Sequence, residues 1–537
     1  VTWFTTPTGG TVLPNSQVLS SGDYYAESNA GTGCLSLTRT KVTVTVIQQV
    51  WTGAISTDWN VPGNWSCGSL PNLSSNIQIP NVANKPVLST GATGAVKNIN
   101  ISSNSSLTVT NNTLQIAGTI TNSGTFTATS GTIEMRGSAA QVIGTNLFSS
   151  NTIKGLTINN AAGVTLQGPL NVTGVVSALS GNLISGGNLT LASTAAQTAL
   201  IDGTGTGSVT GNVTMQRYLP SGFGYKYLSS PFQSATVNEY TDDVDLAATF
   251  PTFYAYDEDN HRDSAGISIY SSGWVKYITA ANPLVPVSGY AANMGANAAA
   301  KTINATGIVN SGNLTRTLYN HNRVYTKGFN LAGNPYPSPI NWNAASGWTK
   351  TNIDNALYYF DASTTDQYTG TYSTYINGIS SNGTANGIIP SMQGFFIHVS
   401  NGSYPVTATL AMDNRVRINN LTPAFHKSET TQDQPLVRLS AAYENQNVID
   451  PVVVYFDANA SQGFDQMLDA LKLMNTDLNV PNLYAVTPQT DLLSISALPL
   501  PADSITRVPL GIKTEKAGWV ILNATNLDNI PSGLNVY

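Results

Sequence analysis

The chain has 537 residues, of which 41% are hydrophobic and only 10% are charged, and its formal net charge is −6. Its length predicts three or four domains, and a polar surface built from Ser, Thr, Asn and Gly favours strands and turns over helices. The small negative charge and the lack of a basic stripe argue against nucleic-acid binding. We therefore expect an all-β, multidomain protein.

Cysteine content and hydropathy argue against three further classes. The only cysteines are Cys34 and Cys67, which excludes a disulfide scaffold and a metal cluster of CxxC type. No run of about 18 apolar residues is present, so we expect no transmembrane segment. The chain opens on VTWFTTPTGG, which is typical of a strand and a turn rather than a signal peptide, so we expect it to belong to a longer protein.

Residues 1–48 are predicted to be the C-terminal part of an immunoglobulin-like domain. The run SLTRTKVTVTV places Val42, Val44 and Val46 on one face, with the period of two that marks a half-buried strand. Roughly 45 residues are too few for a complete sandwich of about 100. We expect Cys34 to face a cysteine outside this sequence or, alternatively, to be a buried free thiol.

Residues 49–212 are predicted to form a β-solenoid with a Trp-rich cap. Apolar clusters of two to four residues, such as LQIAGTI, GTFTAT and GNLTL, recur between Asn, Gly and Ser turns. Such short strands bury their apolar sides only when they stack, and Asn and Gly suit tight corners. An antiparallel sandwich is the alternative. The spacing is too irregular to define a repeat length.

The stretch WTGAISTDWNVPGNWSCGSLPN contains three of the 8 tryptophans, Trp51, Trp59 and Trp65. Three buried indoles could seal the open end of a stacked core. The alternative is a platform on which sugar rings stack. Turns separate the three tryptophans, whereas a platform favours a spacing of two or four along one strand. We expect a cap in which all three rings are buried.

Two β-sandwich or jelly-roll domains are predicted to follow, over residues 213–420 and 421–537. The first is rich in aromatic strands bounded by Gly and Pro, and the second is incomplete and leads toward a sorting domain. Within the second, SQGFDQMLDALKLMN is the one predicted helix. Its apolar residues Phe464, Met467, Leu468 and Leu471 have helical spacing.

The loop YDEDNHRDSAG is the best candidate for a cation site. Asp257, Asp259, Asn260 and Asp263 offer the hard oxygen ligands that calcium prefers. The alternative is a solvated acidic loop, because no acidic residue closes the loop at its twelfth position. The segment TDDVD, residues 241–245, is a weaker candidate. The sequence suggests no cofactor other than calcium at this loop.

The stretch DQYTGTYSTYING is the candidate ligand-binding segment. Tyr368, Tyr372 and Tyr375 could cover the face of a sugar ring, and Asn377 could bond its hydroxyl groups. Tyrosine is also favoured in protein-binding loops. The alternative is that these aromatics belong to the core of the sandwich.

Sequence motifs of catalysis are missing, so no catalytic residue is predicted and a non-enzymatic protein is expected. Between residues 73 and 201 the one acidic residue is Glu134, which cannot supply the carboxylate pair of a glycosidase. The four histidines lack metal-binding spacing, and no GxSxG, P-loop or dinucleotide motif occurs. His398 lies in FFIHV, where a strand residue with a hydrogen-bonded ring is expected.

Several longer stretches resemble parts of secreted Bacteroidota proteins that the type 9 secretion system exports. GFNLAGNPYPSPINW, PSMQGFFIHV and YLPSGFGYKYLSSPF resemble one module of those proteins. WTGAISTDWNVPGNWSCGSLPN followed by NIQIP resembles the start of their β-solenoid-like segments, and GGTVLPNSQVLSSGDYYAESNAGTGCLSL the end of their immunoglobulin-like repeats. DPVVVYFDANASQGFDQMLDALKL, with NLYAVTP, RVPLGI and SGLNVY, resembles the region before their C-terminal sorting domain.

This resemblance implies a large cell-surface adhesin of the kind used in gliding motility. It implies as partners the type 9 secretion machinery and an outer-membrane carrier, reached through C-terminal strands that the sequence lacks, and extracellular glycans or surfaces. It implies an extracellular, outer-membrane-attached location. The alternative is the carbohydrate-binding region of a larger secreted enzyme that acts on polysaccharides.

The resemblance also implies O-glycosylation. Exported Bacteroidota proteins carry O-glycans on a motif of Asp, Ser or Thr, and a residue with a methyl-bearing side chain. The motif occurs with Ser264 and with Ser504 as acceptors, both in predicted loops. Chance matches in a Ser/Thr-rich sequence are the alternative.

Overall fold

The computed structural model describes residues 1–15, 22–29, 35–44, 48–260, 273–423, 434–500 and 506–530. The structure is almost entirely β, with 46% strand and 3% helical residues, which confirms the predicted all-β fold. The helical residues form four short 3-10 turns: η1 (Pro62–Asn64), η2 (Ser149–Asn151), η3 (Val237–Tyr240) and η4 (Asn414–Val416). None of the described helices is long and apolar enough to span a membrane.

The chain divides into two compact units, residues 1–127 and 128–537, and the division falls inside strand β11 (Thr125–Met135). The first unit begins with an antiparallel sheet of β1 (Thr2–Phe4), β2 (Gly22–Glu27) and β3 (Thr40–Val44). Phe4 and Tyr24 are buried, and the Arg39 guanidinium lies 3.2 Å from the centroid of the Phe4 ring. Val42, which was expected to be half-buried, is exposed. Cys34 lies outside the described residues.

The rest of the first unit is solenoid, built from parallel strands. One sheet has the order β10-β8-β5-β4, and two short strands pair with β9 beside it. The strands are β4 (Gln49–Val50), β5 (Asn76–Ile79), β6 (Val87–Leu88), β7 (Gly94–Val96), β8 (Asn98–Ile101), β9 (Ser106–Ile116) and β10 (Ile120–Asn122).

Side chains stack in register along this ladder, which explains the sequence pattern. Ile77 lies opposite Ile99, both are buried, and Ile99 lies opposite Ile120 on the next strand. Between the apolar rows, the Asn98 side-chain amide donates to Asn76 Oδ1 at 2.7 Å. Alternation of apolar and amide residues therefore gives each strand a core side and a hydrogen-bonded outer side.

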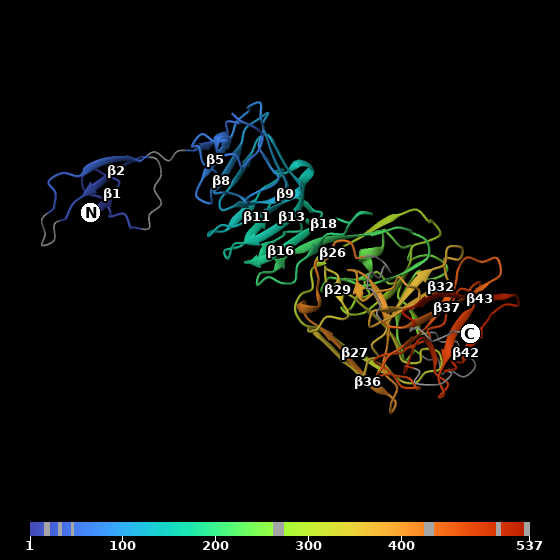
Figure 1. Cartoon of the computed structure of the whole chain (residues 1–537). Helices are drawn as coiled ribbons and strands as arrows, with labels where there is room; N and C mark the ends of the chain where they lie inside the picture. Colours follow the sequence, from blue (N-terminus) through green and yellow to red (C-terminus); the bar gives the residue numbers. More distant parts are fainter. Residues whose placement is uncertain are drawn as a thin grey trace. The chain divides into compact units, whose positions relative to one another are not determined.

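The solenoid continues in the second unit, and about seven turns are formed in all, which confirms the predicted β-solenoid. The strand order is β21-β18-β15-β13-β11, with β16 and β19 beside it and a second parallel sheet β12-β14-β17-β20. Figure 1 labels β11, β13, β16 and β18 of this ladder. The strands are β12 (Gln141–Ile143), β13 (Thr152–Asn159), β14 (Val164–Leu166), β15 (Leu170–Val172), β16 (Val175–Ser180), β17 (Leu183–Ile184), β18 (Leu189–Leu191), β19 (Leu200–Ile201), β20 (Val209–Thr210) and β21 (Asn212–Leu219). An antiparallel sandwich for this region is wrong, because these pairings are parallel.

The last solenoid strand is also the first strand of the next region. β21 pairs in parallel with β18 on one edge, and antiparallel with β26 (Lys301–Ile308) along its whole length on the other. Arg217 on β21 is buried, and burial lowers its pKa to about 10. The solenoid sheet therefore runs directly into the aromatic-rich region without an intervening linker.

Antiparallel sheets make up the aromatic-rich region. Their orders are β22-β25-β23-β24, β27-β36-β30, β28-β35-β31-β32-β33 and β29-β34. The strands are β22 (Tyr225–Leu228), β23 (Phe253–Tyr256), β24 (Trp274–Lys276), β25 (Tyr290–Asn293), β27 (Leu314–Asn320), β28 (Phe329–Gly333), β29 (Ile340–Asn341), β30 (Trp348–Thr351), β31 (Leu357–Ala362), β32 (Gly370–Ile376), β33 (Ile379–Ser380), β34 (Ile388–Ile389), β35 (Gly394–His398) and β36 (Val406–Met412).

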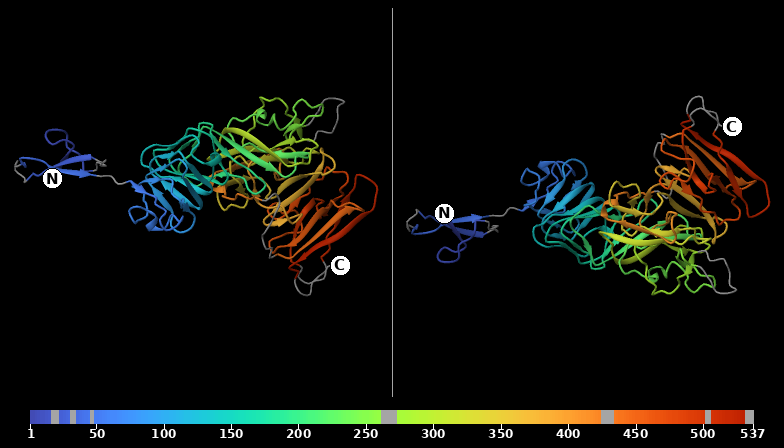
Figure 2. Two further views of the ribbon diagram at one scale, coloured as in Figure 1. Left: turned by 90° about the horizontal axis from the view of Figure 1, so that it is seen from above. Right: turned by 90° about the horizontal axis from the view of Figure 1, so that it is seen from below.

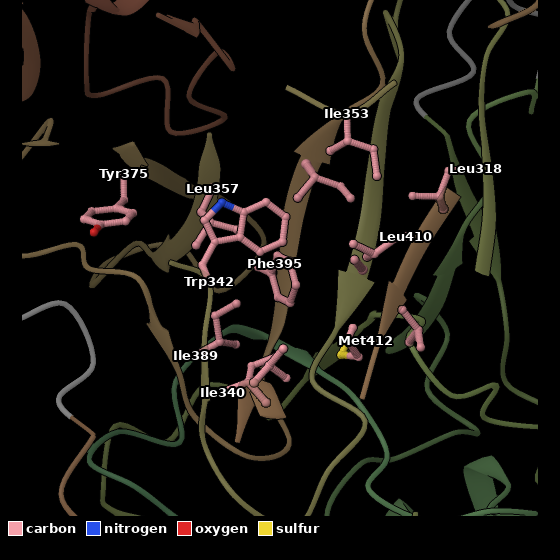
Figure 3. Packing of buried hydrophobic residues seen from close by; sticks show 14 of the residues in the cluster. Leu318, Ile340, Trp342, Ile353, Leu357, Tyr375, Ile389, Phe395, Leu410 and Met412 are labelled. Atoms are coloured by element: carbon pink, nitrogen blue, oxygen red, sulfur yellow. The ribbon is translucent and has the colours of Figure 1, made fainter. Parts of the chain in front are cut away.

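The core of this region contains the GNPYPSPINW motif. Figure 3 shows the Trp342 indole beside Phe395 and Leu357 in the buried cluster. Asn334 organises the preceding turn, because its buried side-chain amide donates to the carbonyls of Ser338, Ile389 and Pro390 at 2.9–3.0 Å. One buried amide thus replaces the backbone partners that a proline-rich turn cannot supply.

The C-terminal region is a seven-stranded sheet of order β42-β40-β41-β38-β37-β43, with β39 beside β41. Its strands are coloured orange to red in Figure 2. The strands are β37 (Leu436–Tyr443), β38 (Asp450–Phe456), β39 (Ala470–Leu471), β40 (Asn482–Val486), β41 (Leu492–Leu498), β42 (Leu510–Lys513) and β43 (Val520–Asp528).

The helix predicted over 461–475 is wrong. The segment forms a turn and then strand β39. The Asp469 carboxylate accepts hydrogen bonds from the backbone N–H of Asp465 at 2.6 Å and from that of Ala497 at 2.5 Å. These bonds fix the turn and attach it to strand β41. Ala470 then pairs with Ile495 of β41. Tertiary pairing outweighs the helical spacing of the apolar residues.

Candidate functional site: an aromatic groove

An aromatic pocket of about 290 Å³ opens in the aromatic-rich region of the second unit. Eight of the ten residues that line it are aromatic. The lining residues are Tyr225, Tyr227, Phe250, Tyr254, Trp274, Ala291, Phe360, Tyr368, Tyr372 and Thr476. We call this cavity the aromatic pocket.

Strand register places one wall of the aromatic pocket on a single sheet face. Tyr227 of β22 lies opposite Ala291 of β25, which lies opposite Tyr254 of β23. Residues that lie directly opposite each other in neighbouring strands share a face, and Tyr225 shares that face because it is two residues from Tyr227. The small Ala291 side chain between two tyrosines leaves the hollow.

A second sheet supplies the other wall. Phe360 of β31 lies opposite Tyr372 of β32, and the Phe360 ring stacks on Tyr227 with centroids 4.8 Å apart. Tyr227 and Tyr372 also share a hydrogen bond of 2.9 Å between their hydroxyl groups. Thr476 of the C-terminal region joins this wall, because its hydroxyl accepts the Gly370 N–H at 2.9 Å. The walls are therefore locked together before any ligand arrives.

Three buried tyrosine hydroxyls of the aromatic pocket, those of Tyr225, Tyr227 and Tyr372, stay protonated at neutral pH. Burial raises the pKa of Tyr372 to about 12. Burial also raises the pKa values of Tyr225 and Tyr227 well above their usual range. These hydroxyls can both donate and accept hydrogen bonds, and they add no negative charge to the pocket.

A polar pocket of about 510 Å³ adjoins the aromatic pocket. The two share Phe250 and Tyr368, whose rings meet edge to face with centroids 5.0 Å apart. Both rings are well exposed, at 54% for Phe250 and 48% for Tyr368. The other lining residues of the polar pocket are Asp243, Asp245, Ala248, Thr249, Thr252, Asn293, Met294, Gly295 and Gln367. We call the two pockets together the aromatic groove.

Asp243 is the most unusual residue of the polar pocket. Its side chain is only 5% exposed, and its Oδ1 lies 3.2 Å from Lys301 Nζ. Burial raises the pKa of Asp243, and Lys301 opposes that rise. Its second oxygen, Oδ2, has no hydrogen-bond partner among the described residues. A buried carboxylate oxygen without a donor is costly.

One family profile matches the chain twice, over residues 50–132 and 130–537. The chain belongs to the DUF8693 family. The family is described as a domain of unknown function, and its matched regions include the solenoid and every residue of the aromatic groove. No curated protein and no solved structure matches the chain.

The groove of this DUF8693 chain contains two of the four predicted ligand-binding residues, Tyr368 and Tyr372. Tyr375 is buried elsewhere and accepts a hydrogen bond of 2.6 Å from the Asn343 amide. Asn377 follows β32, and its amide donates to Met467 O. The four do not form one platform, because Tyr372 and Tyr375 are three residues apart and point to opposite faces of the strand.

The acidic loop of the DUF8693 chain is tied to the protein. Asp259 Oδ1 lies 2.6 Å from Arg323 Nη2, and Asp257 Oδ1 accepts the Asp259 N–H at 3.0 Å. The amide of Asn260 donates to Trp274 O. Among the described residues, no group of three His, Cys, Asp or Glu side chains could hold a metal ion. Asp263, and the predicted glycosylation sites Ser264 and Ser504, lie outside the described residues.

The Trp-rich cap is confirmed in its burial. Trp51, Trp59 and Trp65 are 0%, 1% and 2% exposed, and both outer rings meet Trp65 edge to face, with centroids 5.0 and 4.8 Å away. Two of the indole N–H groups donate to backbone carbonyls: Trp51 Nε1 to Asn84 O, and Trp65 Nε1 to Trp59 O. Trp51 directly follows β4, the first strand of its sheet. The sugar platform at these residues is therefore wrong.

Two other residues noted in the sequence, His398 and Cys67, lie outside the groove. His398 is buried, with Nδ1 2.5 Å from Asp354 Oδ2 and Nε2 2.8 Å from Lys327 O, so its expected hydrogen-bonded ring is confirmed. Cys67 is an exposed free thiol. Sequence reasoning missed most of the groove, including Tyr225, Tyr227, Tyr254 and Trp274 on its walls. The alternating aromatics of YKYL and FYAY are the signal that predicts an aromatic sheet face.

Proposed function

We propose that this chain is a non-enzymatic region of a cell-surface adhesin that the type 9 secretion system of a Bacteroidota species exports. In this proposal the solenoid and sandwiches serve as stalk, and the aromatic groove is the surface that binds during adhesion or gliding. The groove is the single observation that carries the proposal. It combines exposed and buried rings with acid and amide side chains in a preformed concave site, which is the usual composition of a ligand site.

The construction of the fold supports a stalk. β21 belongs at once to the solenoid ladder and to the antiparallel pair with β26. A continuous sheet transmits a pulling force through backbone hydrogen bonds, without a linker that extends first. The solenoid rows of isoleucine and amide side chains also carry almost no charge, which suits a structural element rather than a catalytic one.

A carbohydrate-binding region of a larger polysaccharide-acting enzyme is the second candidate, and it would use the same groove. The eight aromatic residues of the aromatic pocket favour it, because aromatic faces stack on sugar rings. In both candidates the groove binds a ligand. They differ in whether the rest of the protein is an adhesin or a polysaccharide-acting enzyme.

The test measures adhesion of beads that carry the purified chain. Beads bind to surfaces coated with different polysaccharides and to clean glass, under a defined shear flow. We expect wild-type beads to be retained on at least one surface, and Phe250→Ala and Tyr368→Ala beads to be lost from it. Tyr325→Ala is the matched control, because Tyr325 is 49% exposed and does not line the groove.

Two results contradict the proposal. One is retention that is equal for wild type and both groove variants. The other is continuous release of new reducing ends from a polysaccharide by the purified chain, which requires catalysis. Each variant is checked by its circular dichroism spectrum and melting curve, so that loss of binding is not confused with loss of fold.

A further inference from the structure

We infer that the aromatic groove binds a neutral oligosaccharide of at least two sugar residues. One sugar ring lies in the aromatic pocket, and the next presents its hydroxyl groups to the polar pocket, where Asp243 Oδ2 accepts a hydrogen bond. This inference rests on the proposed function and deepens it by naming the class of ligand.

The first step is the shape and chemistry of the aromatic pocket. Tyr227, Ala291 and Tyr254 form a row across one sheet face, with the hollow over the alanine. A sugar ring has one face made of C–H groups, which packs on aromatic rings, and an edge of hydroxyl groups, which needs polar partners. Tyr225 Oη donates to Pro251 O at 3.3 Å, and Tyr227 and Tyr372 share one hydrogen bond, so the hydroxyl oxygens beside the hollow offer that edge mainly acceptors.

The second step is the orphan atom in the polar pocket. Among the described residues no hydrogen-bond donor reaches Asp243 Oδ2, which is buried, although the opposite oxygen of the same carboxylate faces Lys301. Buried polar atoms of native proteins are nearly always hydrogen-bonded, so an exception beside a cavity points to a missing ligand donor. A sugar hydroxyl is such a donor and carries no charge.

The third step is charge. Asp243 and Asp245 line the polar pocket, and Lys301 is the cation that faces Asp243, at 3.2 Å. Two carboxylates against one ammonium leave the pocket negative, so uronate or sulfated sugars are repelled. The same negative charge would attract an amine ligand, but among its described lining residues the aromatic pocket has no acidic residue to pair with one.

The fourth step is the length of the ligand. The two pockets share Phe250 and Tyr368, and their volumes of about 290 and about 510 Å³ are close to or within the range of small-molecule sites, roughly 300–1,000 Å³. A single sugar residue fills one pocket and leaves the other empty. We therefore expect disaccharides and longer oligomers to bind more tightly than the monosaccharide.

The experiment titrates the whole chain by calorimetry with three groups of probes. The neutral group contains cello-, xylo-, manno- and laminari-oligosaccharides of one to six residues. The acidic group contains oligogalacturonates and alginate oligomers, and the cationic group contains choline and a trimethyl-lysine peptide. The variants are Tyr368→Ala, Asp243→Asn and Ala291→Leu, and Tyr325→Ala is the control.

We expect a member of the neutral group to bind, with affinity that rises from one to two residues. Tyr368→Ala lowers that affinity about tenfold, the equivalent of one lost aromatic contact. Ala291→Leu abolishes binding because it fills the hollow. Asp243→Asn weakens neutral binding and relaxes the exclusion of acidic oligomers, whereas Tyr325→Ala changes nothing.

The outcomes separate this inference from the proposed function. Groove-dependent binding of an acidic or cationic probe, with no neutral probe bound, overturns the inference and leaves the groove as the binding surface. Binding of a neutral probe that all groove variants retain overturns the inference as well. If no probe binds and bead adhesion is also independent of the groove, both the inference and the proposed function fail.

Discussion

Single side chains hold together two buried parts of the chain. The three tryptophans after β4 are almost completely buried, and they hold one another edge to face. Asn334 holds the GNPYPS turn through three donated hydrogen bonds. In both places one side chain satisfies several neighbours, so we expect large effects from single substitutions.

Trp65→Ala is expected to destabilise the first unit by about 3–5 kcal/mol, because it removes the indole that both other rings contact. Chemical denaturation followed by tryptophan fluorescence measures this change. Ile55→Ala in the same segment is the control, since Ile55 is exposed. An unfolding midpoint that does not move in Trp65→Ala would show that the rings do not seal a core.

Asn334→Asp is expected to destabilise the aromatic-rich region by several kcal/mol. The variant keeps the acceptor for the Tyr336 N–H but loses the donors to three buried carbonyls, each of which costs about 1–3 kcal/mol when it is unsatisfied. Calorimetry of the variant measures the loss. A melting curve equal to that of wild type would contradict the role given to this amide.

At the scale of elements, the sequence predicts the repeated strands of the solenoid well. It does not predict which sheets pack against each other. The solenoid is readable because its short apolar clusters and amide residues alternate locally, as Ile77, Ile99 and their neighbours do. The groove is not readable, because its walls come from β22–β25 and from β31–β32, and Thr476 comes from a third region. Local patterns place aromatics on a face, but only the tertiary pairing decides which faces meet.

The segment predicted to be a helix also shows that tertiary pairing can outweigh a local pattern. Its spacing of apolar residues is helical, yet Asp469 ends the turn and Ala470 pairs with Ile495. A partner strand more than twenty residues away outweighs the local preference of the segment. Likewise, Tyr372 and Tyr375 point to opposite faces because residues 370–376 form strand β32.

Asp469 gives the C-terminal turn a defined pH dependence. Burial raises its pKa from 3.8 to about 7. Because the folded state then holds a proton that the unfolded state has lost, this residue's contribution to stability is complete below about pH 4 and is lost as the pH rises through 7. We expect Asp469→Asn to become more stable relative to wild type between pH 4 and pH 8. Urea denaturation at several pH values measures the stability difference between the variant and wild type. A difference that is constant over this range would contradict the raised pKa of Asp469.

At the scale of the whole molecule, β21 joins two kinds of architecture into one sheet. It is hydrogen-bonded to β18 of the solenoid and to β26 of the aromatic-rich region. We therefore expect residues 128–420 to unfold cooperatively, and limited proteolysis to yield no stable fragment that ends near residue 212. Mass spectrometry of the digest identifies the fragments, and a persistent solenoid fragment that ends there would contradict the shared sheet.

We propose the aromatic groove as the binding surface of this chain. The most direct measurement is a crystal structure of the chain with the tightest-binding oligosaccharide from the titrations. We predict a sugar ring over Ala291 between Tyr227 and Tyr254, and a hydroxyl group within 2.5–3.0 Å of Asp243 Oδ2. An oligosaccharide bound elsewhere on the chain, with the groove empty, would contradict the claim.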